Sequence, residues 1–100
     1  MMDFPKPTTW DLVAIAAAGV ALALAAANTV LALGGEAGQG PSTTFTLVMI
    51  ALHVLVSSGC LLVLGKTAKH GTIWGNLAAV AGMFIGVSGV LLAGAMWVAA

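Results

Sequence analysis

The chain has 100 residues, of which 61% are hydrophobic and only 6% are charged, and its formal net charge is zero. A soluble domain carries roughly a quarter charged residues, because it needs them to cover its surface. The composition therefore excludes an ordinary soluble domain. Three lysines also offer no basic surface for nucleic acid.

The few charges divide the chain into three long apolar segments. Leu12 to Gly35 is a charge-free run of 24 residues, Ala37 to Gly65 is one of 29, and His70 to Ala100 is one of 31. About 20 apolar residues of helix cross a bilayer core of ~30 Å, so each run is long enough to span once. The sequence therefore predicts an all-α integral membrane protein: a single membrane domain of three transmembrane helices with short turns.

The first span is predicted over residues 9–33. Thr8, with Asp11 three residues later, resembles a capping box in which Asp replaces Glu, and a glycine pair follows the span. Its apolar run exceeds the ~7–15 residues of the hydrophobic part of a signal peptide. We therefore expect a retained span rather than a cleaved leader.

The other two spans are predicted over residues 43–65 and 73–98. Between them lies a short basic turn, residues 66–72. Trp74 and Trp97 fall near the two ends of the third span, where interfacial aromatic residues belong.

The lysines predict an orientation. Lys6 precedes the first span, and Lys66 and Lys69 lie between the second and third, so all three lie on one side of the membrane. The other side carries Glu36. By the positive-inside rule we expect the N-terminus in the cytoplasm and the C-terminus outside, in a bacterial inner or intracytoplasmic membrane.

The third span carries small residues at alternating spacings of four and three, which places them on one stripe of a helix with left-handed packing. These six helix-packing residues are Gly75, Ala79, Gly82, Gly86, Gly89 and Ala93. Helices in lipid associate through close backbone approach and polar contacts, so the stripe predicts a packing surface. It packs either against the first two helices of the same chain or onto another subunit. The bulky opposite side suits lipid or a partner.

Polar residues inside the spans are the candidate functional residues. The second span places Thr46, His53, Ser57 and Cys60 on one stripe, at spacings of seven, four and three. An ionisable residue at mid-depth, here His53, is by default a candidate for function. Depth counting puts His53 level with Ser88 of the third span and within about a turn of Asn28 of the first.

Three interpretations of His53 stay open. The first is a neutral imidazole that is hydrogen-bonded to Asn28, Ser88 or a backbone carbonyl, because a charged ring without a carboxylate partner is costly in lipid. The second is cofactor binding, with the ring ligating a haem iron or a (bacterio)chlorophyll magnesium. The third is a proton relay, although no mid-depth carboxylate would pass the proton onward. Pairing with Cys60 is disfavoured, because the two residues lie ~10 Å apart along the helix.

The spans carry no converging set of acids, bases, nucleophiles or metal ligands. We therefore expect neither an enzyme nor a metal site. The sequence favours a small accessory subunit of a larger energy-transducing complex, respiratory or photosynthetic, with other membrane subunits and lipids as partners. Such a subunit can hold a lipid, a quinone, or a pigment such as a carotenoid or chlorophyll. The alternative is a holin-like protein that assembles into a pore, because stripes of small residues also drive oligomerisation.

One resemblance supports the accessory role. Three short spans in 100 residues, with His53 in the second span and Gly-Ala-Met-Trp-Val at residues 94–98 of the last, resemble the small fourth subunit of bacterial haem-copper oxidases. The likeness extends over about half the chain and implies an accessory place in a respiratory complex. That family has a more charged, histidine-rich second turn than residues 66–70 of this chain.

Overall fold

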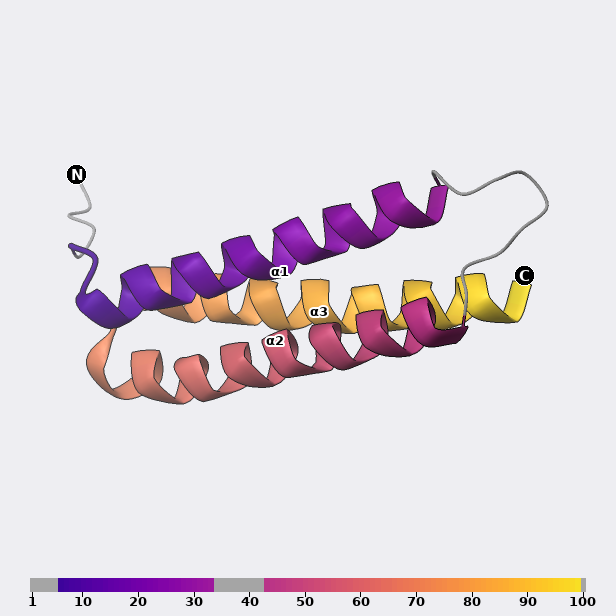
Figure 1. Cartoon of the computed structure of the whole chain (residues 1–100). Helices are drawn as coiled ribbons and strands as arrows, with labels where there is room; N and C mark the ends of the chain where they lie inside the picture. Colours follow the sequence, from indigo (N-terminus) through magenta and orange to yellow (C-terminus); the bar gives the residue numbers. More distant parts are fainter. Residues whose placement is uncertain (1–5, 34–42, 100) are drawn as a thin grey trace.

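A computed structural model describes residues 6–33 and 43–99, apart from the side chains of residues 31–33, 43, 96, 97 and 99. It contains α1 (Thr9–Leu33), α2 (Thr43–His70) and α3 (Ile73–Ala99). The three helices pack against one another, with α1 and α3 running in one direction and α2 in the other (Figure 1). Each is long and apolar enough to cross a membrane, so the predicted three-span, all-α architecture is confirmed. Glu36 and the Trp97 side chain, used in the predictions above, lie outside the described residues.

The capping box predicted at the start of α1 is present. The backbone N–H of Asp11 donates to the Thr8 hydroxyl oxygen at 3.3 Å, and the backbone N–H of Thr8 donates to the Asp11 carboxylate at 2.8 Å. This reciprocal pair satisfies two N–H groups that the first turn of a helix leaves without partners. It fixes the first residue of the helix at Thr9.

The second helix continues beyond its predicted end at residue 65, to His70. A glycine inside a helix costs only about 1 kcal/mol relative to alanine, and Lys69 and His70 suit the negative end of the helix dipole. The Thr67 hydroxyl lies 3.1 Å from the Leu64 carbonyl oxygen and holds the last turns together. As a result, only residues 71 and 72 join α2 to α3.

The buried residues of all three helices recur at spacings of three, four and seven. In α1 they are Asp11, Ala14, Ala21 and Asn28; in α2 they are Thr46, Met49, His53, Cys60 and Thr67. In α3 the residues described as buried are the six small ones of the predicted stripe: Gly75, Ala79, Gly82, Gly86, Gly89 and Ala93. A period of 3.5 residues keeps one seam of each helix facing its neighbours in a left-handed bundle.

The glycines of α3 allow the other helices to approach its backbone. A Cβ atom added at Gly82 would lie 2.5 Å from the Cys60 sulfur and 3.3 Å from the Cα of Ala18, and one added at Gly86 would lie 2.7 Å from the Cβ of Ser57. The stripe therefore packs inside the chain, against both α1 and α2. The outer side of α3 is exposed, and its large apolar residues include Leu77, Phe84, Val87, Leu91 and Val98.

Candidate functional site

A buried carboxylate, Asp11, joins the start of α1 to the start of α3 at one end of the bundle. Asp11 accepts hydrogen bonds from the backbone N–H and the hydroxyl of Thr72, both at 2.8 Å, and from the backbone N–H of Gly75 at 3.0 Å. These N–H groups lie at the start of α3, where a helix lacks internal acceptors and its dipole favours negative charge. Asp11 thus caps α3 from another helix, in addition to its place in the capping box of α1.

Two glycines next to Asp11, Gly71 and Gly75, occupy positions where there is no space for a larger residue. A Cβ atom added at Gly71 would lie 2.7 Å from Oδ1 of Asp11 and 2.9 Å from the Cα of Thr67, and one at Gly75 would overlap Oδ1 of Asp11. The Thr67 hydroxyl also lies 2.8 Å from Oδ1 of Asn76 and so joins α2 to α3. The sequence pattern predicted the local capping box at Asp11. It did not predict the bond between Asp11 and Thr72, which are more than sixty residues apart in the chain.

The second polar region is the interior of the bundle around His53. The ring is fully buried, and Nδ1 lies 2.6 Å from the backbone carbonyl oxygen of Met49. A carbonyl can only accept, so in the neutral ring Nδ1 carries the proton and Nε2 is left as an acceptor. Nε2 has no hydrogen-bond partner in the described part of the chain. Of the three partners considered for His53, the backbone carbonyl is the one that the structure contains. Ser88 is exposed instead of facing the ring.

Ligation of a haem or chlorophyll metal by His53 does not fit this packing. A Cβ atom added at Gly89 would overlap Cδ2 and Nε2 of the ring, so the backbone of α3 lies directly against the nitrogen that would bind the metal. A planar macrocycle has no access to Nε2 unless α3 moves away. Among the described residues, no three His, Cys, Asp or Glu side chains gather where they could hold a metal ion.

Two further buried side chains lack hydrogen-bond partners within the described residues. Both side-chain amide atoms of Asn28 and the hydroxyl oxygen of Thr46 are in this state. Two other hydroxyl groups in this part of the bundle are paired: the Thr29 hydroxyl donates to the Ala25 carbonyl at 2.9 Å, and the Ser57 hydroxyl donates to the Met83 carbonyl at 3.3 Å. Asn28, one of the three partners considered for His53, therefore has no side-chain bond to another helix within the described residues.

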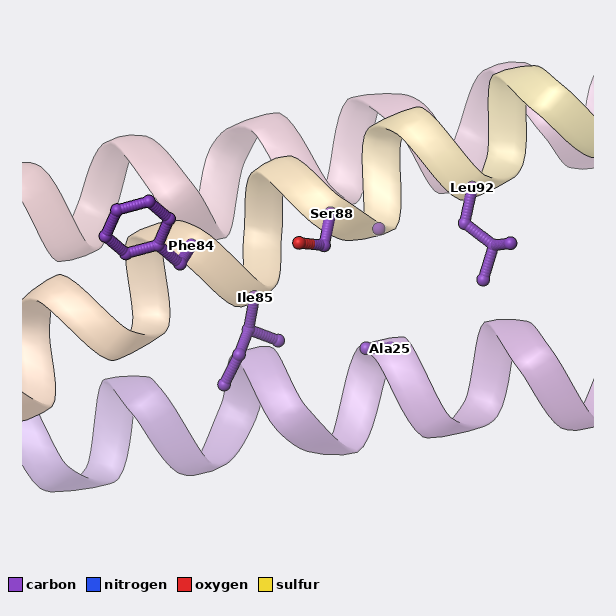
Figure 2. Close-up of a pocket in the computed structure, with 6 residues that line it drawn as sticks. Ala25, Phe84, Ile85, Ser88 and Leu92 are labelled. Atoms are coloured by element: carbon purple, nitrogen blue, oxygen red, sulfur yellow. The ribbon is translucent and has the colours of Figure 1, made fainter.

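The outer side of α3 carries two apolar grooves. The larger, about 250 Å³, lies between α1 and α3, and Figure 2 shows the residues that line it: Ala25, Phe84, Ile85, Ser88, Gly89 and Leu92. The smaller, about 140 Å³, is lined by Val80, Met83, Phe84 and Val87. Phe84 borders both grooves and is 70% exposed. Ser88 contributes the one polar side chain among the residues that line them.

Comparisons of the chain with protein-family models, curated proteins and solved structures find no match.

Proposed function

We propose that this protein is a small, non-enzymatic accessory subunit of a larger energy-transducing membrane complex, respiratory or photosynthetic. The observation that carries the proposal is the outer side of α3, where two apolar grooves flank the exposed Phe84. Aromatic residues, including phenylalanine, are enriched at protein interfaces relative to the rest of the surface. The resemblance to the fourth subunit of haem-copper oxidases directs the proposal to energy-transducing complexes.

The larger groove is the place for a bound lipid, quinone or carotenoid. Its walls are apolar, and the hydroxyl of Ser88 is the single side-chain group there that can form a hydrogen bond (Figure 2). Sites for small apolar molecules combine such walls with a few polar groups that fix orientation. An acyl or isoprenoid chain matches the walls, and a carbonyl or hydroxyl group on it matches Ser88.

The placement of the polar stripe of α2 favours an accessory subunit over a holin-like pore. A pore needs polar side chains that face water at the centre of an oligomer. Thr46, His53 and Cys60 are instead buried inside the bundle, and Ser57 is half-buried and bonded to α3. A pore assembled from this chain would first have to open the bundle.

Purification from the native membrane in mild detergent tests the proposal. We expect the protein to co-migrate with larger, unrelated subunits and a bound apolar molecule. Truncating a central interface anchor commonly costs 2 kcal/mol or more, so Phe84→Ala should lower the co-purified fraction about tenfold or more. Leu62→Ala is the matched control, because Leu62 is 75% exposed on α2, away from both grooves. Homo-oligomers without other subunits, or lysis of the expressing cell, would favour the pore.

Orientation is a separate prediction. Lys66 and Lys69 are exposed on the last turns of α2, at the end of the bundle where α1 begins (Figure 1). In a Cys60→Ala background, a cysteine at position 69 should resist an impermeant reagent applied outside, and one at position 36 should react. The reverse labelling pattern would contradict an N-terminus in the cytoplasm.

A further inference from the structure

All four buried side-chain atoms that lack a partner within the described residues lie in one section of the bundle. They are Nε2 of His53, Oγ1 of Thr46, and Oδ1 and Nδ2 of Asn28. His53 of α2 packs on Gly89 of α3. Gly89 lines the same groove as Ala25 of α1, so Ala25 lies at about the same depth along the bundle as His53. Asn28 lies ~4.5 Å further along α1, and Thr46 lies ~10 Å beyond His53 along α2 in the same direction, because the helices are antiparallel. Asn28 is therefore placed between the levels of the other two.

Within the described residues, none of these donors and acceptors is paired with another. Nε2 of His53 needs a donor, since Nδ1 already donates to the Met49 carbonyl. Asn28 offers two N–H donors and needs a donor for its oxygen, and Thr46 offers one donor. Direct bonds from the Asn28 amide to Nε2 and from the Thr46 hydroxyl to the Asn28 oxygen would still leave one Asn28 N–H without an acceptor, and neither bond is present among the described residues.

We propose that the interior of the bundle around Asn28, His53 and Thr46 binds ordered water, which bridges these three side chains. Buried polar groups in proteins are almost always hydrogen-bonded, and internal water is the usual partner where side chains are too far apart to pair. Water both donates and accepts, so it can donate to Nε2 and to the Asn28 oxygen while accepting from the Asn28 amide and the Thr46 hydroxyl. Larger ligands are disfavoured, because the ring of His53 is fully buried and packed against Gly89.

Solid-state NMR of the full chain in lipid bilayers tests the water site. His70→Gln leaves His53 as the one imidazole in the chain. We expect cross peaks between water protons and both the Asn28 side-chain amide and the His53 ring, and a ¹⁵N shift of Nε2 that is typical of a hydrogen-bonded acceptor. A scalar coupling between Nδ2 of Asn28 and Nε2 of His53, or the absence of water cross peaks, would overturn the proposal.

Two threonine substitutions form a matched pair for the same measurement. Thr46→Val removes a hydroxyl that we assign to the water site, and it should abolish the water cross peak of the Asn28 amide. Thr29→Val removes a hydroxyl beside Asn28 that is already bonded to the Ala25 carbonyl, so it should leave that cross peak in place. Equal effects of the two substitutions would show that Thr46 does not hold the water. Both variants keep the shape of the side chain, so folding should survive in each.

Discussion

Asp11→Ala is expected to destabilise the protein more than any other single polar substitution in the bundle. The carboxylate accepts hydrogen bonds from the backbone N–H groups of Thr8, Thr72 and Gly75 and from the Thr72 hydroxyl. Alanine would leave these donors without their acceptor at a buried helix start. Breaking one buried hydrogen bond to a charged group commonly shifts a folding equilibrium about tenfold or more. The thermal midpoint of unfolding in detergent or nanodiscs measures the loss.

The asparagine variant gives the same prediction a finer test. Oδ1 accepts the backbone N–H groups of Thr72 and Gly75, and the side-chain oxygen of asparagine can keep both bonds. Its NH₂ group would replace Oδ2, which accepts from the N–H of Thr8, so two donors would then face each other. The midpoint for Asp11→Asn should therefore fall between those of the wild type and Asp11→Ala.

Thr8→Ala is the control that separates the two roles of Asp11. It removes the hydroxyl that accepts the Asp11 N–H in the capping box of α1 and leaves the bonds to α3 intact. We expect a small loss from it, typical of one helix cap. A loss as large as that of Asp11→Ala would mean that the local box, and not the link between α1 and α3, is the stabilising element.

The fold was predictable from sequence because length and charge decide it in lipid. A charge-free run of more than 20 residues has few stable alternatives to a spanning helix. The inward side of α3 also follows from spacing, since small residues at intervals of three and four can lie only on one side of a helix. The structure buries the six small residues of this stripe, from Gly75 to Ala93, against α1 and α2.

The partners of the polar residues could not be predicted in the same way, because they depend on helix rotation and on side-chain direction. Depth counting placed Ser88 level with His53. The next residue, Gly89, is the one that faces the ring, and Ser88 is turned by about 100° into the outer groove. The link from Asp11 to the start of α3 depends on how the α2–α3 turn is positioned, which no local pattern contains. The predicted end of α2 at residue 65 is too early: the helix continues through Gly65 to His70, and Gly71 is the glycine that follows it.

Gly89→Ala is the second substitution with a large expected effect. The added methyl group would overlap Cδ2 and Nε2 of His53. The ring has little freedom to move away, because it is fully buried and its Nδ1 is bonded to the Met49 carbonyl. Either α3 must separate from α2 or the imidazole must leave its rotamer. Overpacking of this kind typically costs about 1–3 kcal/mol of unfolding free energy.

Gly94→Ala is the matched control in the same helix. Outside the backbone of its own helix, no atom of the described residues lies within 4 Å of the position that its Cβ would occupy, so the methyl group meets open space there. Alanine is a better helix former than glycine, and this variant should gain about 0.5–1 kcal/mol. The two substitutions are chemically identical and should have opposite signs, as measured by steric trapping or by denaturation in mixed micelles.

A double variant identifies the contact responsible. If the imidazole is what the added methyl group meets, Gly89→Ala should cost little in a His53→Ala background, because the shortened side chain leaves space for it. The coupling between the two substitutions should then be close to the whole cost of Gly89→Ala alone. If Gly89→Ala is equally harmful with and without the imidazole, the close packing of His53 on Gly89 is not what holds α2 against α3, and the interior described around Asn28 would need a different arrangement.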